Sequence, residues 1–178
     1  YDFYDDDFVC EAIERTHDIA HENIGDIHPD CSMKLPSYVI PKDKTADSAL
    51  VEMCKLALVD KGLSNNQEYV QRTISELQVI REKDFAEYFL TMKKIIDIAW
   101  QKQLVGPGRG SGAGSLVNYL LGITNVDPIE YNLLFERFLD PLRTEYPDID
   151  TDVSDRDELI EQLRSEFGAE NVVPISNY

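Results

Sequence analysis

The sequence predicts an α+β fold, in which helices flank a mixed sheet and a helical N-terminal segment precedes them. Three observations support this fold class. Apolar residues recur every three or four positions over several segments, as in amphipathic helices. A glycine-rich run joins an apolar pair to a helix-like segment at 116–121. Residues 147–153 alternate acidic and apolar side chains, which is the pattern of a strand.

The N-terminal part of the chain is expected to form one helix and a connector. Apolar residues between positions 6 and 24 have helical spacing, and a glycine follows them. Residues 25–44 hold three prolines, which favours an extended segment. We therefore assign residues 1–44 to a helical junction segment and residues 45–178 to the main domain.

Two further helices are predicted from capping residues and apolar stripes. Thr45 or Asp47 can cap a helix that ends at Gly62. Its expected buried face consists of Leu50, Met53, Cys54, Ala57 and Leu58. The next helix spans residues 66–83. Its expected buried face consists of Val70, Ile74, Leu77 and Ile80.

The second half of the chain is expected to supply the strands. Residues 85–100 are densely apolar and predict a buried strand that leads into a helix, although periodicity alone does not place the junction. Residues 147–153, which we call the aspartate segment, predict a second short strand. Asp155 is a suitable cap for a last helix that stops at Gly168.

The composition limits the classes of function. A net charge of −17 argues against a free-standing DNA-binding protein, because affinity for DNA comes largely from Lys and Arg. Residues 1–30 carry −9 of this charge and residues 104–147 only −2, so tight DNA binding would need basic surface from outside this chain. Three cysteines without a CxxC pattern, and no long apolar run, predict a soluble cytoplasmic protein.

Residues 106–115, which we call the glycine loop, predict a phosphate-binding turn. Five glycines in nine positions let backbone amides approach an anion at the start of a helix. Arg109 and Ser111 add donors that suit phosphate oxygens. No Gly-Lys-Ser/Thr occurs, which disfavours a P-loop NTPase. A flexible or helix-packing turn without a ligand is the structural alternative.

Three acidic residues, Asp148, Asp150 and Asp152, are expected on one face of the aspartate segment, because side chains alternate along a strand. Divalent cations would offset their mutual repulsion, and oxygen ligands favour Mg²⁺ or Mn²⁺ over zinc. An EF-hand is excluded, since Val153 and Leu159 replace its glycine and glutamate. A solvated acidic edge strand is the structural alternative.

Three motifs carry a family resemblance. VGPGRGSGAGS at 105–115, LLFERFLDP at 133–141 and PDIDTD at 147–152 occur in the order and spacing of one family. With them, the chain resembles bacterial replicative DNA polymerases of family C, the polymerase III α subunit. The resemblance implies a palm domain related to the polymerase β nucleotidyltransferases.

The resemblance also implies a nucleotide site. Gly110 and Ser111 would hold the triphosphate of an incoming dNTP, with Gly108 and Arg109 beside them. Arg137, in the segment at 133–141, would support the same site. The activity implied is template-directed addition of dNTP to a primer 3′-hydroxyl.

By the same resemblance, Asp150 and Asp152 are the catalytic, metal-binding aspartates, and two Mg²⁺ ions are expected in the complete enzyme. Asp148 matches an acid that does not bind metal. A third catalytic aspartate would follow an inserted thumb, and the chain ends at Tyr178, about where that thumb would begin. Residues 45–178 would therefore be a partial palm.

The resemblance leaves the chain incomplete as an enzyme. The PHP domain, the fingers, the thumb and the segment that binds the sliding clamp are missing, so we expect a fragment that is inactive in isolation. Its partners in the complete enzyme would be dNTP and primer–template DNA, with the clamp and other replisome subunits as candidates. A bacterial and a phage origin are equally compatible with the sequence.

Two other functional classes stay open. Residues 108–113 satisfy the relaxed GxGxxA fingerprint, with Asp127 or Glu130 at the distance of a ribose acceptor, which predicts a dinucleotide-dependent oxidoreductase. A non-catalytic interaction module, docking through the acidic N-terminal helix, predicts no metal-dependent nucleotide binding.

A zinc site is the last alternative. His17 and His21 lie on adjacent helical turns, and His28 and Cys31 are near in sequence. Such a pair on an amphipathic helix is more often a surface or core feature than a metal site.

Overall fold

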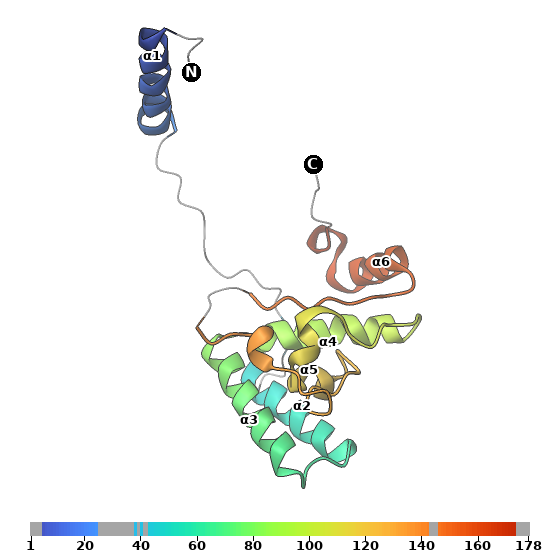
Figure 1. The fold of residues 1–178 in the computed structure, drawn as a ribbon. Coiled ribbons are helices and arrows are strands. Elements are labelled where there is room, and N and C mark those ends of the chain that lie inside the picture. The colour runs from blue at the N-terminus through green and yellow to red at the C-terminus, as the bar shows by residue number, and fades with distance from the viewer. Residues whose placement is uncertain (1–4, 25–37, 39, 41–42, 143–145, 174–178) are drawn as a thin grey trace. The chain divides into compact units, whose positions relative to one another are not determined.

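The computed structural model describes residues 5–24, 38, 40, 43–142 and 146–173. The chain divides into two compact units, Tyr1–Lys34 and Leu35–Tyr178. Figure 1 shows the helices of both units. Most of the predicted connector at 25–44 lies outside the described residues, as do His28 and Cys31.

The first unit contains the predicted N-terminal helix. Helix α1, Asp6–Asp18, begins after Asp5, whose side chain accepts a hydrogen bond from the Asp7 amide. A π-helical turn, η1 Ile19–Asn23, continues it. Helix α1 has no buried residue, so its apolar stripe is exposed in this unit.

The second unit is built from helices that surround one core. In chain order these are α2 Ala46–Asp60, α3 Gln67–Glu82, α4 Ala86–Trp100, η2 Gly110–Gly114, α5 Leu116–Leu121, η3 Phe135–Arg137, α6 Arg156–Phe167 and η4 Ala169–Asn171. The short helix α5 packs against α2 and α3, while α4 packs against α2 and α6 (Figure 1). Phe89 of α4 and Leu116 of α5 are among the fully buried side chains of this core.

Local sequence signals explain where several helices begin and end. Thr45, not Asp47, caps α2, and it forms a reciprocal capping box with Ser48. Asp155 caps α6 by accepting from the Glu158 amide, as predicted. Gly122 ends α5 in a left-handed conformation with φ +73°, which suits glycine.

The predicted buried face of the third helix is partly wrong. Ile74 is 61% exposed, whereas Thr73, Glu76 and Ile80 are buried. The buried face of α3 is therefore rotated from the apolar stripe, because the Glu76 carboxylate and the Thr73 hydroxyl occupy core positions. This rotation places an acidic residue inside the protein.

The predicted α+β palm, with its mixed sheet and flanking helices, is wrong. Among the described residues there is no strand, only an isolated antiparallel bridge between Val105 and Val153. Residues 85–100, predicted as a strand leading into a helix, form the single helix α4 from Ala86. A dense apolar run fits a helix buried on several faces as well as a strand, and fifteen residues is a helix length.

The aspartate segment is extended but does not belong to a sheet. It pairs with the start of the glycine loop and the residues just before it. The Gly106 N–H donates to the Asp152 carbonyl, at 2.8 Å, and the Ser154 N–H donates to the Leu104 carbonyl, at 3.1 Å. Two short extended segments form a stable sheet only with further strands beside them. No other segment continues this pairing in the described ranges.

Helices long and apolar enough to cross a bilayer are not found in the part of the chain that the structure describes.

Candidate functional site

The glycine loop lies directly against the aspartate segment. A side chain on Gly110 would clash with the Asp150 carboxylate, and one on Gly106 would lie 3.0 Å from Asp152 Cβ. Gly110 also has φ +62°, a left-handed conformation that other residues rarely adopt. The loop therefore favours glycine at position 110 for its backbone conformation, and the Asp150 carboxylate lies close to it.

Burial along the aspartate segment alternates as the sequence predicts. Pro147 and Ile149 are buried, whereas Asp148, Asp150 and Asp152 are exposed. Buried neighbours on one side thus hold the segment extended and present the three carboxylates to solvent. The side-chain alternation of a strand is preserved here even though a sheet is absent among the described residues.

An ion pair links the loop to the acids. Arg109 Nη1 lies 3.1 Å from Asp152 Oδ1, and the two side chains are 64% and 61% exposed. Ion pairs this exposed are weak, about 0–1 kcal/mol, because water screens both charges. Asp152 can therefore exchange this partner for another cation at small cost.

A cavity of 490 Å³, which we call the loop cavity, opens beside the glycine loop. Its lining residues are Gly110, Ser111, Ala113, Gly114, Asn132, Leu133, Leu134 and Arg137. The structure thus brings Arg137 to the same cavity as Gly110 and Ser111, although they are far apart in sequence. Gly108 lies outside this lining and packs over Thr124.

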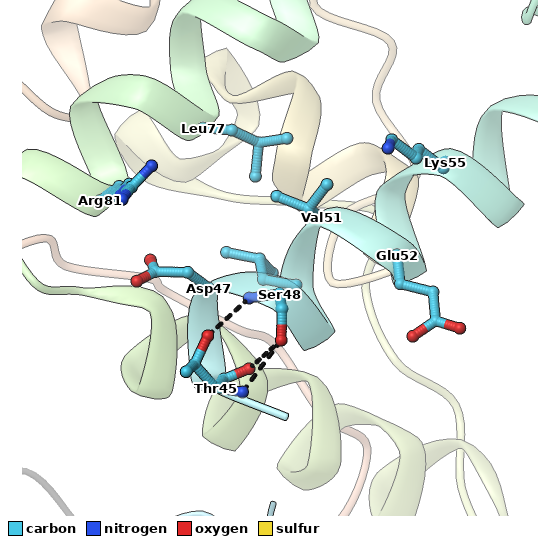
Figure 2. Close-up of a pocket in the computed structure, with 9 residues that line it drawn as sticks. Thr45, Asp47, Ser48, Val51, Glu52, Lys55, Leu77 and Arg81 are labelled. Carbon is cyan, nitrogen blue, oxygen red and sulfur yellow. Dashed lines mark hydrogen bonds between the residues drawn. The ribbon is translucent and has the colours of Figure 1, made fainter. Parts of the chain in front are cut away.

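A larger cavity, of 630 Å³, lies elsewhere, between the start of α2 and α3. Figure 2 shows Leu77 and Arg81 of α3 facing Val51 of α2 across it. None of the predicted site residues lines this cavity.

The backbone amides at the N-terminus of α5 are hydrogen-bonded to a side chain that the sequence pattern did not indicate. The carboxylate of Glu76, from α3, accepts hydrogen bonds from Ser115 Oγ at 2.9 Å and from the amides of Leu116 and Val117, each at 3.0 Å. Glu76 is completely buried. These two amides are therefore not available to an external phosphate, and the predicted anion site can only lie earlier in the loop.

Arg72 completes this buried cluster. Its Nε lies 2.6 Å from Glu76 Oε1, and its Nη2 donates to the carbonyls of Gly114 at 3.1 Å and Leu133 at 3.2 Å. Burial raises the pKa of the Glu76 carboxyl, while the hydrogen bonds from Arg72 and the α5 amides oppose that shift. We call Arg72 and Glu76 the buried pair.

A local signal for the buried pair was present but ambiguous. Arg72 and Glu76 have the i,i+4 spacing of a helical ion pair, which in sequence alone indicates a solvated helix face. The hydrogen-bond partners of Glu76 in α5 lie about forty positions away. Only the tertiary contact between α3 and α5 shows that Glu76 is internal and that Arg72 is partly covered.

Asp127 does not serve as a free ribose acceptor. Its carboxylate accepts from Tyr69 Oη at 2.7 Å and from the amides of Ile129 and Glu130. The hydrogen bond to Asp127, together with burial, raises the pKa of Tyr69 to about 12. The alternative of a dinucleotide-binding domain thus loses one of its two proposed acceptors, and Glu130 remains exposed.

The histidines on the first unit do not form a metal site with other described residues. The rings of His17 and His21 lie 4.3 Å apart between centroids, and His17 is near the Asp18 carboxylate. No group of three or more His, Cys, Asp or Glu side chains suitable for a metal occurs within the described ranges.

Comparison with known proteins identifies the family. The sequence-family model described as the bacterial DNA polymerase III alpha NTPase domain matches residues 48–178 of this chain. The chain is 41% identical over 177 residues to the DNA polymerase III subunit alpha of Aquifex aeolicus and 40% identical over 171 residues to that of Bacillus subtilis, which is 96% and 94% of this chain. That of Thermotoga maritima is 49% identical over 123 residues, or 67% of this chain.

The chain therefore belongs to the bacterial DNA polymerase III alpha family, as the resemblance predicted. It spans about 15% of the length of each of these three relatives.

Proposed function

We propose that this chain is the nucleotide-binding part of a DNA-directed DNA polymerase catalytic subunit. Family membership supports the class of reaction. The observation that carries the residue assignment is the contact between Gly110 and Asp150, which sets a glycine-rich turn against two exposed carboxylates. Phosphoryl transfer needs this combination, because a triphosphate and its metal ions must be held together.

In this proposal the incoming dNTP binds at the mouth of the loop cavity. Gly110, and Gly108 just before it, let the backbone of the loop approach the phosphates closely, and the Ser111 hydroxyl donates to a phosphate oxygen. Arg109 and Arg137 supply the positive charge that the triphosphate needs. Arg109 would turn from Asp152 toward the phosphates, an exchange that the weak exposed ion pair permits.

Asp150 and Asp152 are better suited to Mg²⁺, which also binds substrate phosphates and water, than to a metal ion that needs a full set of protein ligands. Asp150 and Asp152 offer only oxygen donors and are exposed on one side of their segment. Mg²⁺ is commonly bound by one or two carboxylates together with substrate phosphates and water. A third protein ligand is therefore not required within the described residues, and Mn²⁺ suits the same donors.

The reaction proposed is the attack of a primer 3′-hydroxyl on the α-phosphate of the bound dNTP, with release of pyrophosphate. Bound Mg²⁺ would stabilise the charge that develops on the attacking and leaving oxygens. The chain's own residues fix the triphosphate at residues 108–111 and orient it relative to Asp150 and Asp152. Positioning of this kind is a major part of catalysis in phosphoryl transfer.

We further propose that the rest of a longer polypeptide, in the cytoplasm of a bacterium, completes the enzyme. The net charge of −17 makes this chain alone a poor ligand for primer–template DNA. Basic surface from other domains, and a sliding clamp and other replisome subunits, are the partners proposed to hold the DNA. On its own the chain is expected to be inactive.

The test compares Asp150→Asn with Asp148→Asn in the complete natural polypeptide. Both residues are exposed acids of one segment, and only Asp150 is assigned to the metal. Loss of a metal ligand removes several kcal/mol of transition-state stabilisation, so dNTP incorporation should fall about a thousandfold for Asp150→Asn. For Asp148→Asn it should fall less than about tenfold. Equal activities of the two variants would refute the assignment.

A further inference from the structure

We propose that Arg72 and Glu76 are positioning residues for the nucleotide site: they fix the width of the loop cavity from inside the protein without touching the nucleotide. This inference rests on the proposed function. It assigns a role to side chains on α3, which none of the three sequence motifs contains.

The first step is the bridging contact of Arg72. One nitrogen of its guanidinium, Nη2, donates to the carbonyls of both Gly114 and Leu133. These two residues line the loop cavity, Gly114 on the glycine loop and Leu133 on the segment that leads to Arg137. A single side chain therefore ties together the two stretches of chain that form the cavity.

The second step is the anchoring of α5. Glu76 satisfies two amides at the N-terminus of α5 and the hydroxyl of Ser115, the residue that ends the glycine loop. Unsatisfied buried amides are unfavourable, so this end of the loop is held in one place. Asn118 Nδ2 adds a hydrogen bond to the Gly112 carbonyl, at 2.9 Å, on the same loop.

The third step concerns charge. The carboxylate of Glu76 neutralises both the positive end of the α5 dipole and the guanidinium of Arg72. A triphosphate is therefore not drawn to the base of α5 or to Arg72. Among the described residues, Ser111 and Arg137 line the outer part of the loop cavity and supply the donors proposed for it.

Close packing makes the cavity sensitive to this bridge. A Cβ on Gly114 would lie only 2.7 Å from the Leu134 carbonyl, so the two stretches of chain already touch. If the bridge is lost, they can shift relative to each other, and Ser111 and Arg137 no longer meet the phosphates together. Nucleotide binding should suffer while DNA binding does not.

The experiment uses Arg72→Lys in the complete natural polypeptide. Lysine keeps a positive charge near Glu76 but lacks the fork that reaches the carboxylate and the two carbonyls. We expect the KM for dNTP to rise roughly tenfold, since charged hydrogen bonds of this kind are lost. The dissociation constant for primer–template DNA should change less than about twofold. A second variant, Glu76→Gln, should also raise the KM for dNTP.

Two further variants separate positioning from loss of stability. Ile80→Ala empties a fully buried site on the same helix α3, away from the loop cavity, and should lower Tm without raising the KM for dNTP. Arg109→Gln removes a charge proposed to bind the phosphates and should raise that KM directly. All assays are run at one temperature, below the Tm of the least stable variant.

The outcomes distinguish the two proposals. If Arg109→Gln raises the KM for dNTP and Arg72→Lys does not, the positioning role is wrong and the nucleotide site stands. An equal rise in KM for Ile80→Ala and Arg72→Lys would also overturn the positioning role, because a general loss of stability would explain both. If neither arginine variant changes the KM in an active enzyme, the assignment of the glycine loop itself fails.

Discussion

Two arginine–carboxylate pairs contact the glycine loop, one at each end, and they differ in nearly every physical respect. The buried pair, Arg72 and Glu76, is 25% and 0% exposed and lies at the base of α5. Arg109 and Asp152 are 64% and 61% exposed at the start of the loop. The N–O distances are 2.6 Å and 3.1 Å, respectively.

The difference shows how one pairing of residue types can serve two purposes. Every oxygen of Glu76 is satisfied by protein donors, so the buried pair is held to the fold and removing one partner leaves an uncompensated charge. The exposed pair has water as an alternative partner, so either member can leave it at little cost. The first suits a scaffold and the second suits a site that exchanges ligands.

The largest effect expected from this comparison is on Glu76. Glu76→Ala leaves Arg72 and two α5 amides without their partner, and should lower the free energy of unfolding by about 3–5 kcal/mol. The measurement is urea unfolding of the 178-residue chain.

Replacing both members of the buried pair provides the control. In the double variant Arg72→Met with Glu76→Leu, no unpaired charge remains, so a large part of the stability should return. If Glu76→Ala changes the free energy of unfolding by less than about 1 kcal/mol, the claimed difference between the two pairs is wrong, because the buried pair would then behave like an exposed one.

A smaller effect is expected from the glycines of the loop. In Gly114→Ala the new Cβ would lie 2.7 Å from a backbone oxygen, that of Leu134, which cannot rotate away. The free energy of unfolding should fall by about 1–3 kcal/mol, as in other overpacked sites. The measurement is again urea unfolding.

Gly112→Ala is the matched control for Gly114→Ala. Its nearest neighbour, Asn118 Nδ2, is 3.6 Å away, which is an ordinary contact, and its φ is not positive. The change in the free energy of unfolding should stay below about 1 kcal/mol. Equal losses for the two variants would show that the loop tolerates no side chain anywhere, and that the contact with Leu134 has no special role.

Signals local in sequence predicted much of the helical structure. Asp155 and Gly168 mark the ends of α6 through hydrogen bonds within three or four residues, so the sequence alone predicts them. For α2 the sequence left Thr45 and Asp47 as alternative caps, and the structure shows Thr45. The alternation of exposed and buried residues in the aspartate segment was likewise predictable, because it depends only on the two-residue period of extended backbone. The motifs also predicted the family.

Signals that depend on distant partners were missed. Residues 85–100 are densely apolar, which is typical of both a buried strand and a buried helix. Their packing against α2 and α6, which the local sequence does not reveal, selects the helix α4. The expected sheet required strands beside Val105 and Val153, and the described residues provide one bridge. Glu76 was missed because its burial is stabilised by donors in α5, which the sequence of α3 does not reveal.

The smallest effect is expected at the exposed pair. Arg109→Gln and Asp152→Asn should each change the free energy of unfolding by less than about 1 kcal/mol, because water replaces the lost partner. A double-mutant cycle in urea should give a coupling energy below about 0.5 kcal/mol, and added salt should reduce it further. The matched comparison is the buried pair, whose coupling should be several times larger.

The cycle at Arg109 and Asp152 also bears on how the site would accept a nucleotide. A weak coupling means that the Arg109 guanidinium can turn to the phosphates, and Asp152 to a metal ion, without unfolding any part of the loop. A coupling above about 2 kcal/mol would instead mean that the pair is a structural contact, since exposed pairs do not reach that value. Arg109 would then stay on Asp152, and Arg137 alone would have to supply the positive charge for the triphosphate.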